Sequence, residues 1–209
     1  MEKSDIRVAG VVLAGGQSLR MGQDKATLTL NHQSLLSRAM ALLAEAGLTK
    51  RVVSGQYEGV ECIVDQQFGL GPIAGIAACA EALCNDYDAM LIIPIDMPLL
   101  AVEDCTYLLR LYQQYHQENN TVYSSGLYYR DAIFPMLISL TSPLLNYLYE
   151  IIDIEDKKAR SLYRLFETLD IKGIKSKHID ATRFENTNTP EQWQRCLNTF
   201  ATMQQTNKN

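Results

Sequence analysis

A glycine-rich stretch near the amino terminus carries the residues best able to do chemistry. Gly15 and Gly16 directly follow an apolar run, and Arg20 and Lys25 come shortly after them. Glycine lets phosphate oxygens approach backbone N–H groups, because a Cβ atom would hold them away. Two cations on such a loop could neutralise a triphosphate. The stretch favours phosphate binding, and an ordinary surface turn with solvated charges is the alternative.

Spacing excludes two common nucleotide motifs from this stretch. Gly15 and Gly16 are adjacent, and Gly22 comes too late for the fingerprint G-x-G-x-x-G. A Walker loop is excluded too, because Ala26 follows Lys25 where that motif has Ser or Thr for magnesium.

An acidic residue follows a second apolar run. Asp96 lies in Pro94-Ile95-Asp96-Met97-Pro98, and its carboxylate should emerge at the same sheet edge as the glycine-rich loop. Magnesium prefers one or two carboxylates together with phosphate oxygens and waters. Asp96 is therefore a candidate metal ligand, and a turn-capping role is the alternative. Asp65, by contrast, looks like an ordinary turn residue.

The histidines and cysteines form no recognisable catalytic or metal constellation. The three histidines are scattered, and Ser18 has no partners at the spacing of a hydrolase triad. The five cysteines are an odd set without a Cys-x-x-Cys pair, which is typical of small buried hydrophobic residues.

Hydrophobic periodicity predicts alternating strands and helices along the chain. The expected strands cover residues 7–14, 51–54, 61–64, 89–93, 121–124, 133–138 and 174–179. The expected helices cover residues 34–46, 73–83, 103–115, 143–152 and 160–169, with a last helix from Pro190. This order predicts an α/β fold: a Rossmann-like, doubly wound, mainly parallel sheet with helices on both faces.

Length and composition point to one ordinary globular domain covering residues 1–209. The chain is 47% hydrophobic, and 19 Lys and Arg against 24 Asp and Glu give a formal charge of −5. This balance argues against nucleic acid as a partner and against a polybasic membrane anchor. We expect no membrane span, because the apolar runs are far shorter than about 18 residues. The amino terminus lacks the features of a secretory signal, so a cytoplasmic location is expected.

The glycine-rich stretch resembles the signature of the molybdenum cofactor guanylyltransferase family, L-A-G-G-x-S-x-R-M-G-x-D-K. Every fixed position is met between Leu13 and Lys25. The resemblance continues at Gly71-Pro72-Ile73-Ala74-Gly75-Ile76, Pro94-Ile95-Asp96-Met97-Pro98, Arg160-Ser161-Leu162 and Asn186-Thr187-Asn188-Thr189-Pro190. It therefore spans nearly the whole chain.

The resemblance implies a specific reaction and fold. The family transfers GMP from GTP to molybdopterin, forms the guanine dinucleotide cofactor, releases pyrophosphate and requires Mg²⁺. The implied fold is of the nucleotide-diphospho-sugar transferase type, with the nucleotide over residues 1–100 and the acceptor over residues 101–200. GTP and molybdopterin are the expected substrates. A cofactor-delivery protein and molybdoenzyme apoproteins are the expected partners.

The resemblance also assigns site residues, which carry over position by position. Arg20, Lys25 and Asp96 are the expected catalytic residues, and Asp96 is also the expected metal ligand. Asn188 is expected beside the acceptor. The expected nucleotide-binding residues are Leu13, Ala14, Gly15, Gly16, Lys25, Ser54, Asp65 and Asp96.

Two positions depart from the family pattern. Relatives often have Asn near Ser54, and they commonly have a polar residue at the position of Phe134. Base recognition and acceptor identity are the properties that these departures affect.

Three other functions compete with guanylyl transfer. Cytidylyl transfer to molybdopterin and nucleotidyl transfer to another small phosphate acceptor use the same chemistry. The third is a non-enzymatic nucleotide-binding protein that delivers the cofactor. The presence of Arg20, Lys25 and Asp96 together argues against this last alternative, because simple binding does not need all three.

Overall fold

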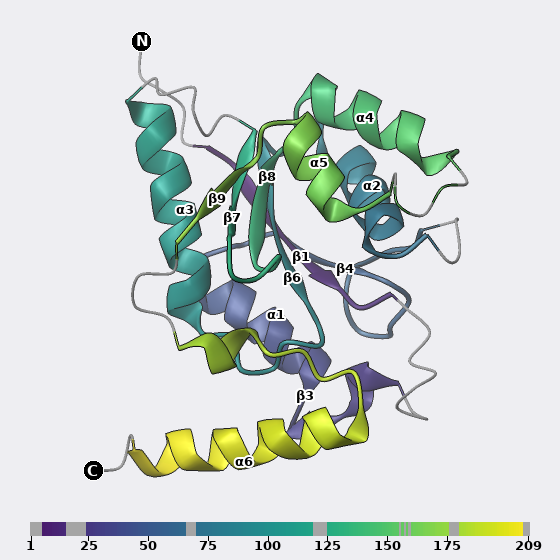
Figure 1. The fold of residues 1–209 in the computed structure, drawn as a ribbon. Coiled ribbons are helices and arrows are strands. Elements are labelled where there is room, and N and C mark those ends of the chain that lie inside the picture. The colour runs from purple at the N-terminus through teal and green to yellow at the C-terminus, as the bar shows by residue number, and fades with distance from the viewer. Residues whose placement is uncertain are drawn as a thin grey trace.

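A central seven-stranded sheet organises the protein (Figure 1). This computed structural model describes residues 6–15, 24–65, 70–118, 125–154, 156, 158, 160–175 and 180–206. The strand order is β5-β4-β1-β6-β8-β7-β9. The strands are β1 (Val8–Leu13), β4 (Arg51–Ser54), β5 (Cys62–Ile63), β6 (Ala89–Pro94), β7 (Gly126–Tyr129), β8 (Met136–Ser139) and β9 (Lys172–Ile174).

The sheet is mainly parallel, as predicted. Strands β5, β4, β1 and β6 pair in parallel, and β7 pairs in parallel with β9. Strand β8 runs antiparallel to both of its neighbours, β6 and β7. The predicted doubly wound α/β class is therefore confirmed, with one reversed strand in the second half of the sheet.

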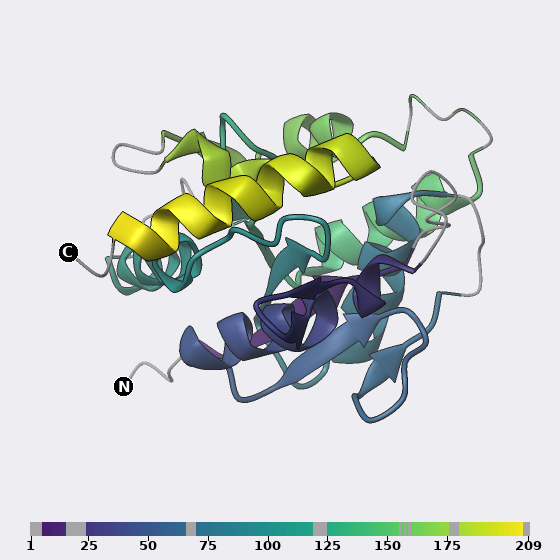
Figure 2. The same ribbon diagram turned by 90° about the horizontal axis from the view of Figure 1, so that it is seen from below.

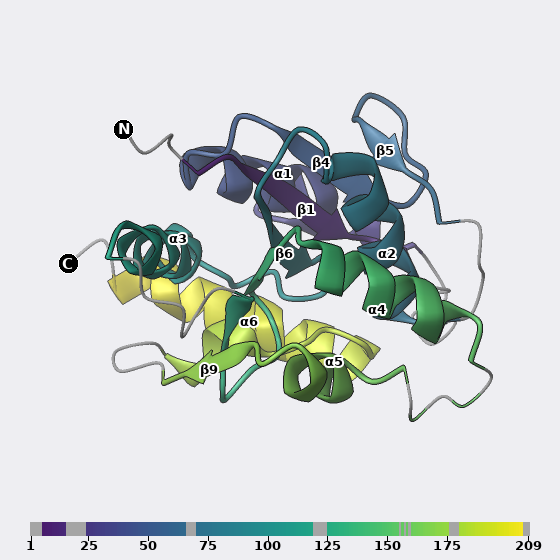
Figure 3. The ribbon, with the colours of Figure 1, turned by 90° about the horizontal axis from the view of Figure 1, so that it is seen from above.

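Helices cover both faces of the sheet (Figure 3). Helices α1 (Leu35–Glu45) and α3 (Val102–Gln117) lie together on one face. Helices α2 (Pro72–Leu83), α4 (Ser142–Ile152) and α5 (Leu162–Thr168) cover the other. The last helix, α6 (Pro190–Thr206), lies across the molecule (Figure 2). It contacts α1 through Arg38, whose guanidinium carbon is 5.3 Å from the centre of the Phe200 ring.

The core follows from the two apolar central strands. Every residue of β6 is buried, and Val11 and Val12 of β1 have no exposed surface. Strands covered by helices on both faces need such continuous apolar sequences. Among the described helices, none is both long enough and apolar enough to cross a membrane.

Element boundaries agree with the predicted signals in the first half. Helix α1 begins after Ser34, whose Oγ accepts a hydrogen bond from the Ser37 N–H at 3.1 Å, and it ends just before Gly47. Such a cap satisfies one of the free N–H groups at a helix start. Strand β4 covers the predicted range, β6 and α2 are each one residue longer than predicted at one end, and β1 and β5 are each one residue shorter at both ends.

The second half departs further from the prediction. Strand β8 begins at Met136 rather than at residue 133, after a cis Phe134–Pro135 bond, because Pro135 has no N–H for the strand ladder. Strand β9 begins at Lys172, and the predicted residues 176–179 lie outside the described part. The predicted strand 121–124 also lies outside it, and β7 follows at Gly126.

Four short elements were not predicted. The 3₁₀ turns η1 (Lys25–Thr27) and η3 (Ala181–Phe184) are too short for a periodic signal. The hairpin of β2 (Thr29–Leu30) and β3 (Gln33–Ser34) turns at Asn31 and His32. Both turn residues have positive φ, as the favoured two-residue hairpin turn requires.

Candidate functional site

The site lies at the carboxyl edge of the parallel strands. In the sheet register Leu13 lies between Ser54 of β4 and Pro94 of β6. The chain keeps this pairing beyond the strands, since the Ala14 N–H donates to the Ser54 carbonyl at 3.1 Å and the Ile95 N–H donates to the Leu13 carbonyl at 3.0 Å. Loops from three strands are therefore held side by side. This edge is where open α/β sheets bind their ligands.

Lys25 is held by its local structure and by two distant segments. Asp24 caps η1, because its Oδ1 accepts the Ala26 N–H at 2.9 Å. The Lys25 Nζ then lies 2.5 Å from Asn188 Oδ1 and 3.5 Å from Asp96 Oδ2. Only 13% of the Lys25 side chain is exposed. The structure thus brings together three of the predicted site residues.

Asp96 is held in place through its backbone. Its carbonyl accepts the Thr187 N–H at 2.8 Å and the Thr187 hydroxyl at 3.1 Å. Thr187 is buried, so residues 186–188 dock directly on the loop after β6. Arg38 supports the same loop, because its Nε donates to the Pro98 carbonyl at 2.7 Å. These contacts leave the Asp96 carboxylate, 22% exposed, facing Lys25.

Asn188 is set by the start of helix α6. The Gln192 Oε1 accepts the backbone N–H groups of Asn188 at 2.7 Å and of Thr189 at 3.0 Å. In return the Thr189 hydroxyl accepts the Gln192 N–H at 3.3 Å. This reciprocal pair is a capping box, in which two free N–H groups are satisfied by side chains. The sequence Asn-Thr-Pro therefore both begins a helix and supplies an amide to the site.

Ser54 lies in the wall of the site and is nearly buried. Its hydroxyl packs against Gly75 of α2, where a Cβ atom would overlap it. Burial raises the pKa of the neighbouring Cys79 thiol to about 12, partly offset by a hydrogen bond with Ser54. Ser54 thus fixes the spacing between β4 and α2, while its backbone carbonyl holds the turn at Ala14.

A cleft of about 840 Å³ opens above this edge. It contains every predicted site residue that lies in the described part of the chain, Asp65 included. Gly16 and Arg20 lie outside the described part. The cleft is lined by Leu13, Ala14, Gly15, Lys25, Ser54, Asp65, Gly71, Pro72, Gly75, Pro94, Ile95, Asp96, Met97, Asp131, Ala132, Ile133, Phe134, Leu162, Tyr163, Phe184, Asn186 and Asn188.

Sequence reasoning missed several residues of the second half of the cleft. Asp131, Tyr163 and Phe184 line it without belonging to any recognisable spacing. Tyr163 directly follows the matched segment Arg160-Ser161-Leu162, which is the one signal that could have found it. The other two reach the cleft only through tertiary packing.

Tyr57 was also missed, and it lies at the base of the glycine-rich turn. Its hydroxyl donates to the Ala14 carbonyl at 3.1 Å and is 3.5 Å from Asp24 Oδ1. Burial, followed by the negative charge of Asp24, raises the pKa of Tyr57 to about 12. The phenol therefore stays protonated at neutral pH and bridges residues on both sides of segment 16–23.

The donors in the cleft are carboxylates rather than a preformed metal cage. Within the part of the chain that the structure describes, no three His, Cys, Asp or Glu residues are grouped closely enough to hold a metal ion. Asp65, Asp96 and Asp131 line the cleft with Lys25 as the one cation among the described lining residues. Their hard oxygens are suited to a cation that arrives with a phosphate ligand.

A glycine turn, a lysine and an aspartate thus lie together at the carboxyl edge of an open α/β sheet, where such folds bind their ligands. Comparisons with known proteins show the family to which the chain belongs. The profile of the MobA-like NTP transferase domain matches residues 10–171. A molybdenum cofactor guanylyltransferase of Xanthomonas euvesicatoria pv. vesicatoria is 34% identical over 188 residues, covering 90% of this chain and 93% of that protein. The chain belongs to the MobA-like NTP transferase family and is a nucleotidyltransferase.

Solved structures share the fold. Molybdopterin-guanine dinucleotide biosynthesis protein A from Archaeoglobus fulgidus superposes with a TM-score of 0.69 at 20% identity, over 93% of this chain and 99% of that one. A Mycobacterium tuberculosis protein crystallised with manganese superposes with a TM-score of 0.60 at 14% identity, over 92% and 98%. The fold is that of nucleotide-diphospho-sugar transferases.

Proposed function

We propose that this protein transfers GMP from GTP to molybdopterin, forms the guanine dinucleotide cofactor and releases pyrophosphate. The observation that carries the proposal is the placement of Lys25 between Asp96 and Asn188 beside the glycine turn. This site lies in a chain that is 34% identical, over 90% of its length, to a protein named for that reaction.

The lining of the cleft supports a division between the two substrates. Leu13, Gly15, Ser54 and Asp65 line it from the first half of the chain, where we place GTP. Phe134, Leu162, Tyr163 and Phe184 line it from the second half, where we place molybdopterin. Lys25, Asp96 and Asn188 lie between the two groups. The chain is then one catalytic domain, with a nucleotide half of about residues 1–100 and an acceptor half of about residues 101–200.

The proposed reaction is an in-line displacement. An oxygen of the molybdopterin phosphate forms a bond to the α-phosphorus of GTP, while the bond from that phosphorus to the bridging oxygen of pyrophosphate breaks. No protein nucleophile is needed, because the attacking phosphate is already anionic. The Lys25 ammonium offsets the charge that develops on the phosphates, and Asn188 and Asp96 hold it in position. On sequence grounds we assign Arg20 and the N–H groups at Gly15 and Gly16 to the same task.

A divalent cation fits the carboxylates of this cleft. Asp65 and Asp96 place carboxylate oxygens in the part of the cleft beside the glycine turn, so a bare triphosphate bound there would be repelled by them. We propose that Asp96 holds Mg²⁺, which would supply positive charge to the triphosphate and to the leaving pyrophosphate. The manganese complex of the Mycobacterium tuberculosis protein supports a divalent ion in this fold.

The cysteines support a cytoplasmic location. All five lack disulfide partners, three of them buried and two partly exposed. Thiols stay reduced in the cytoplasm, whereas oxidising compartments favour disulfides. A cofactor-delivery protein and the molybdoenzyme apoproteins are the partners that this function would require.

One experiment tests the proposed function. The protein is incubated with Mg²⁺, molybdopterin and each of the four nucleoside triphosphates in turn, and released pyrophosphate is measured. GTP should be converted much faster than CTP or ATP. Equal or faster turnover with CTP would point to cytidylyl transfer. Turnover of GTP only with a sugar phosphate as acceptor would point to the other alternative.

A further inference from the structure

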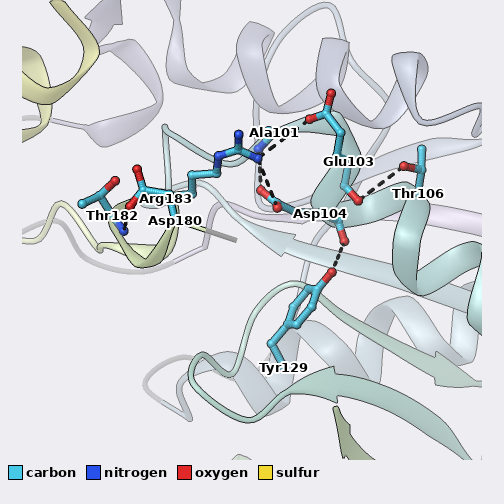
Figure 4. A network of polar contacts seen from close by, with 8 residues as sticks. All are labelled: Ala101, Glu103, Asp104, Thr106, Tyr129, Asp180, Thr182 and Arg183. Carbon is cyan, nitrogen blue, oxygen red and sulfur yellow. Dashed lines mark hydrogen bonds and ion pairs between the residues drawn. The ribbon is translucent and has the colours of Figure 1, made fainter. Parts of the chain in front are cut away.

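A buried carboxylate outside the cleft has a distant partner. Asp104 lies in the first turn of α3 (Figure 4). Its side chain has no exposed surface. Its Oδ2 accepts the Ala101 N–H at 2.8 Å, which caps the helix. Its Oδ1 has no hydrogen-bond partner among the described residues. Burial raises the pKa of Asp104, and the nearby Arg183 charge opposes that shift.

Arg183 supplies the compensating charge from another part of the chain. Its Nη1 is 3.6 Å from Asp104 Oδ1 and 3.9 Å from Glu103 Oε2. Arg183 belongs to η3, which Asp180 caps by accepting the Thr182 N–H at 3.0 Å. A buried carboxylate is costly unless it is paired, so this ion pair ties η3 to α3.

The segment beyond Arg183 leads into the cleft. We call residues 180–188 the strap. Phe184 lines the cleft, and its ring centre is 5.3 Å from that of Tyr129. The Tyr129 hydroxyl donates to the Asp104 carbonyl at 2.8 Å (Figure 4). Tyr129 therefore contacts both Phe184 of the strap and Asp104 of α3. The strap ends at Thr187 and Asn188, which contact Asp96 and Lys25.

We propose that Arg183 and Asp104 form a latch that positions the strap, with Arg183 acting as a positioning residue for the acceptor half of the cleft. Arg183 itself is not among the residues that line the cleft. It fixes the first end of the strap, while Thr187 and the capping box fix the second. Without this ion pair, the backbone at Arg183 is no longer held to α3, and the neighbouring Phe184 is less firmly positioned. The effect on the acceptor depends on the proposed function, whereas the latch itself does not.

The test compares Arg183→Ala with the wild type in two measurements. Hydrogen exchange of the backbone N–H groups should become faster across residues 184–187. The KM for molybdopterin should rise and kcat/KM should fall by about 10- to 100-fold, because small misplacements at a reacting site cost that much. Affinity for GTP should change by less than about threefold, because the glycine turn is still held by the hydrogen bonds of Ala14 with Ser54 and Tyr57.

Three variants separate positioning from general stability. Arg7→Ala breaks the exposed Arg7–Asp88 ion pair at the opposite edge of the sheet and should change neither measurement. Arg183→Lys keeps the charge and should recover most of the acceptor affinity. Asp104→Asn added to Arg183→Ala removes the uncompensated buried charge, so it should restore the melting temperature and leave the KM for molybdopterin high.

Two outcomes would overturn the latch. The first is unchanged exchange at residues 184–187 in Arg183→Ala. The second is a double variant whose KM for molybdopterin returns to the wild-type value together with its stability. The exchange measurement needs no substrate. If the wild-type protein fails to transfer GMP, the proposed function is wrong. The exchange measurement would still show whether the Arg183–Asp104 ion pair holds the strap.

Discussion

The ammonium group of Lys25 has a different environment from that of an ordinary surface lysine. Only 13% of its side chain is exposed. The Lys25 side chain is largely enclosed because the segments that carry Asn188 and Asp96 converge on η1. An ammonium has three N–H donors, so a lysine held by one carboxylate and one neutral amide keeps one donor for a phosphate.

Replacing Lys25 should therefore affect catalysis far more than folding. Lys25→Ala should lower kcat by about 10²–10³, as the loss of one charged transition-state contact does. The free energy of unfolding should fall by only about 1 kcal/mol, the net value of a lost side-chain hydrogen bond, because water can enter the cleft and hydrate Asp96 and Asn188. Steady-state kinetics and denaturant unfolding measure the two effects.

Lys50→Ala is the matched control for Lys25→Ala. Lys50 is also paired with a carboxylate, that of Glu61 at 2.5 Å, and it lies at the amino edge of the sheet. Its removal should leave kcat unchanged. A large loss of stability in Lys25→Ala, with normal activity per folded molecule, would assign Lys25 a structural role instead.

Asp96 should be the residue through which magnesium acts. Asp96→Asn keeps the shape of the side chain and removes the negative charge that the ion needs. GMP transfer should fall sharply, and GTP affinity should lose most of its dependence on Mg²⁺. Titrations of GTP with and without Mg²⁺ measure this change.

The corresponding control is Asp88→Asn, which removes the carboxylate of an ion pair at the opposite edge. That variant should keep the full Mg²⁺ dependence of GTP binding. If Asp96→Asn keeps it as well, Asp96 is not the metal ligand.

Among the elements, the start of α6 joins folding to the site. The capping box of Thr189 and Gln192 satisfies the N–H groups of Thr189 and Asn188. The same bonds fix the backbone from which the Asn188 amide reaches Lys25. Helix stability and site geometry therefore depend on one side chain.

Gln192→Ala should accordingly change both properties. The protein should lose about 1 kcal/mol of stability, the usual value of a helix cap. Its kcat/KM should fall by up to about tenfold, because Asn188 is less well held. Thermal unfolding and kinetics measure the two losses.

Gln194→Ala on the same helix serves as the comparison. Its Nε2 donates to Asn198 Oδ1 on an exposed face at 3.2 Å. The substitution should leave kcat/KM unaltered. Equal kinetic losses in both variants would show that the capping box has no special link to the site.

At the scale of the whole molecule, the packing of helices α2, α3 and α6 controls the reactivity of the thiols. Burial raises the pKa of Cys79 to about 12 and that of Cys196 to about 11, and it also raises the pKa of Cys105. A raised thiol pKa means that the reactive thiolate is scarce at pH 8, by a factor of about 10³ or more.

Native protein at pH 8 should therefore react with a thiol reagent in two phases. Cys62 and Cys84, which are partly exposed, should react first, and the three buried cysteines should react only as the protein unfolds. A colorimetric thiol titration with and without denaturant measures the phases. Five equally fast thiols in the native protein would contradict the packing of these three helices.

The sequence alone was enough to predict the alternating elements, the fold class and the residues at the carboxyl edge of the first strands. Its information is local: apolar runs define β1 and β6, and the segment from Leu13 to Lys25 carries a complete motif. Residues such as Asp96 could be placed because parallel strands end at one edge.

Only the tertiary structure decided which distant side chains meet. Lys25 and Asn188 are 163 positions apart, and no local pattern relates them. Phe184 and Asp131 reach the cleft because the strap and the turn after β7 pack there. Strand β8 runs antiparallel to both β6 and β7, a direction that no local pattern in the sequence predicts. Such contacts depend on the summed packing of many residues, so the identity of any single one does not predict them.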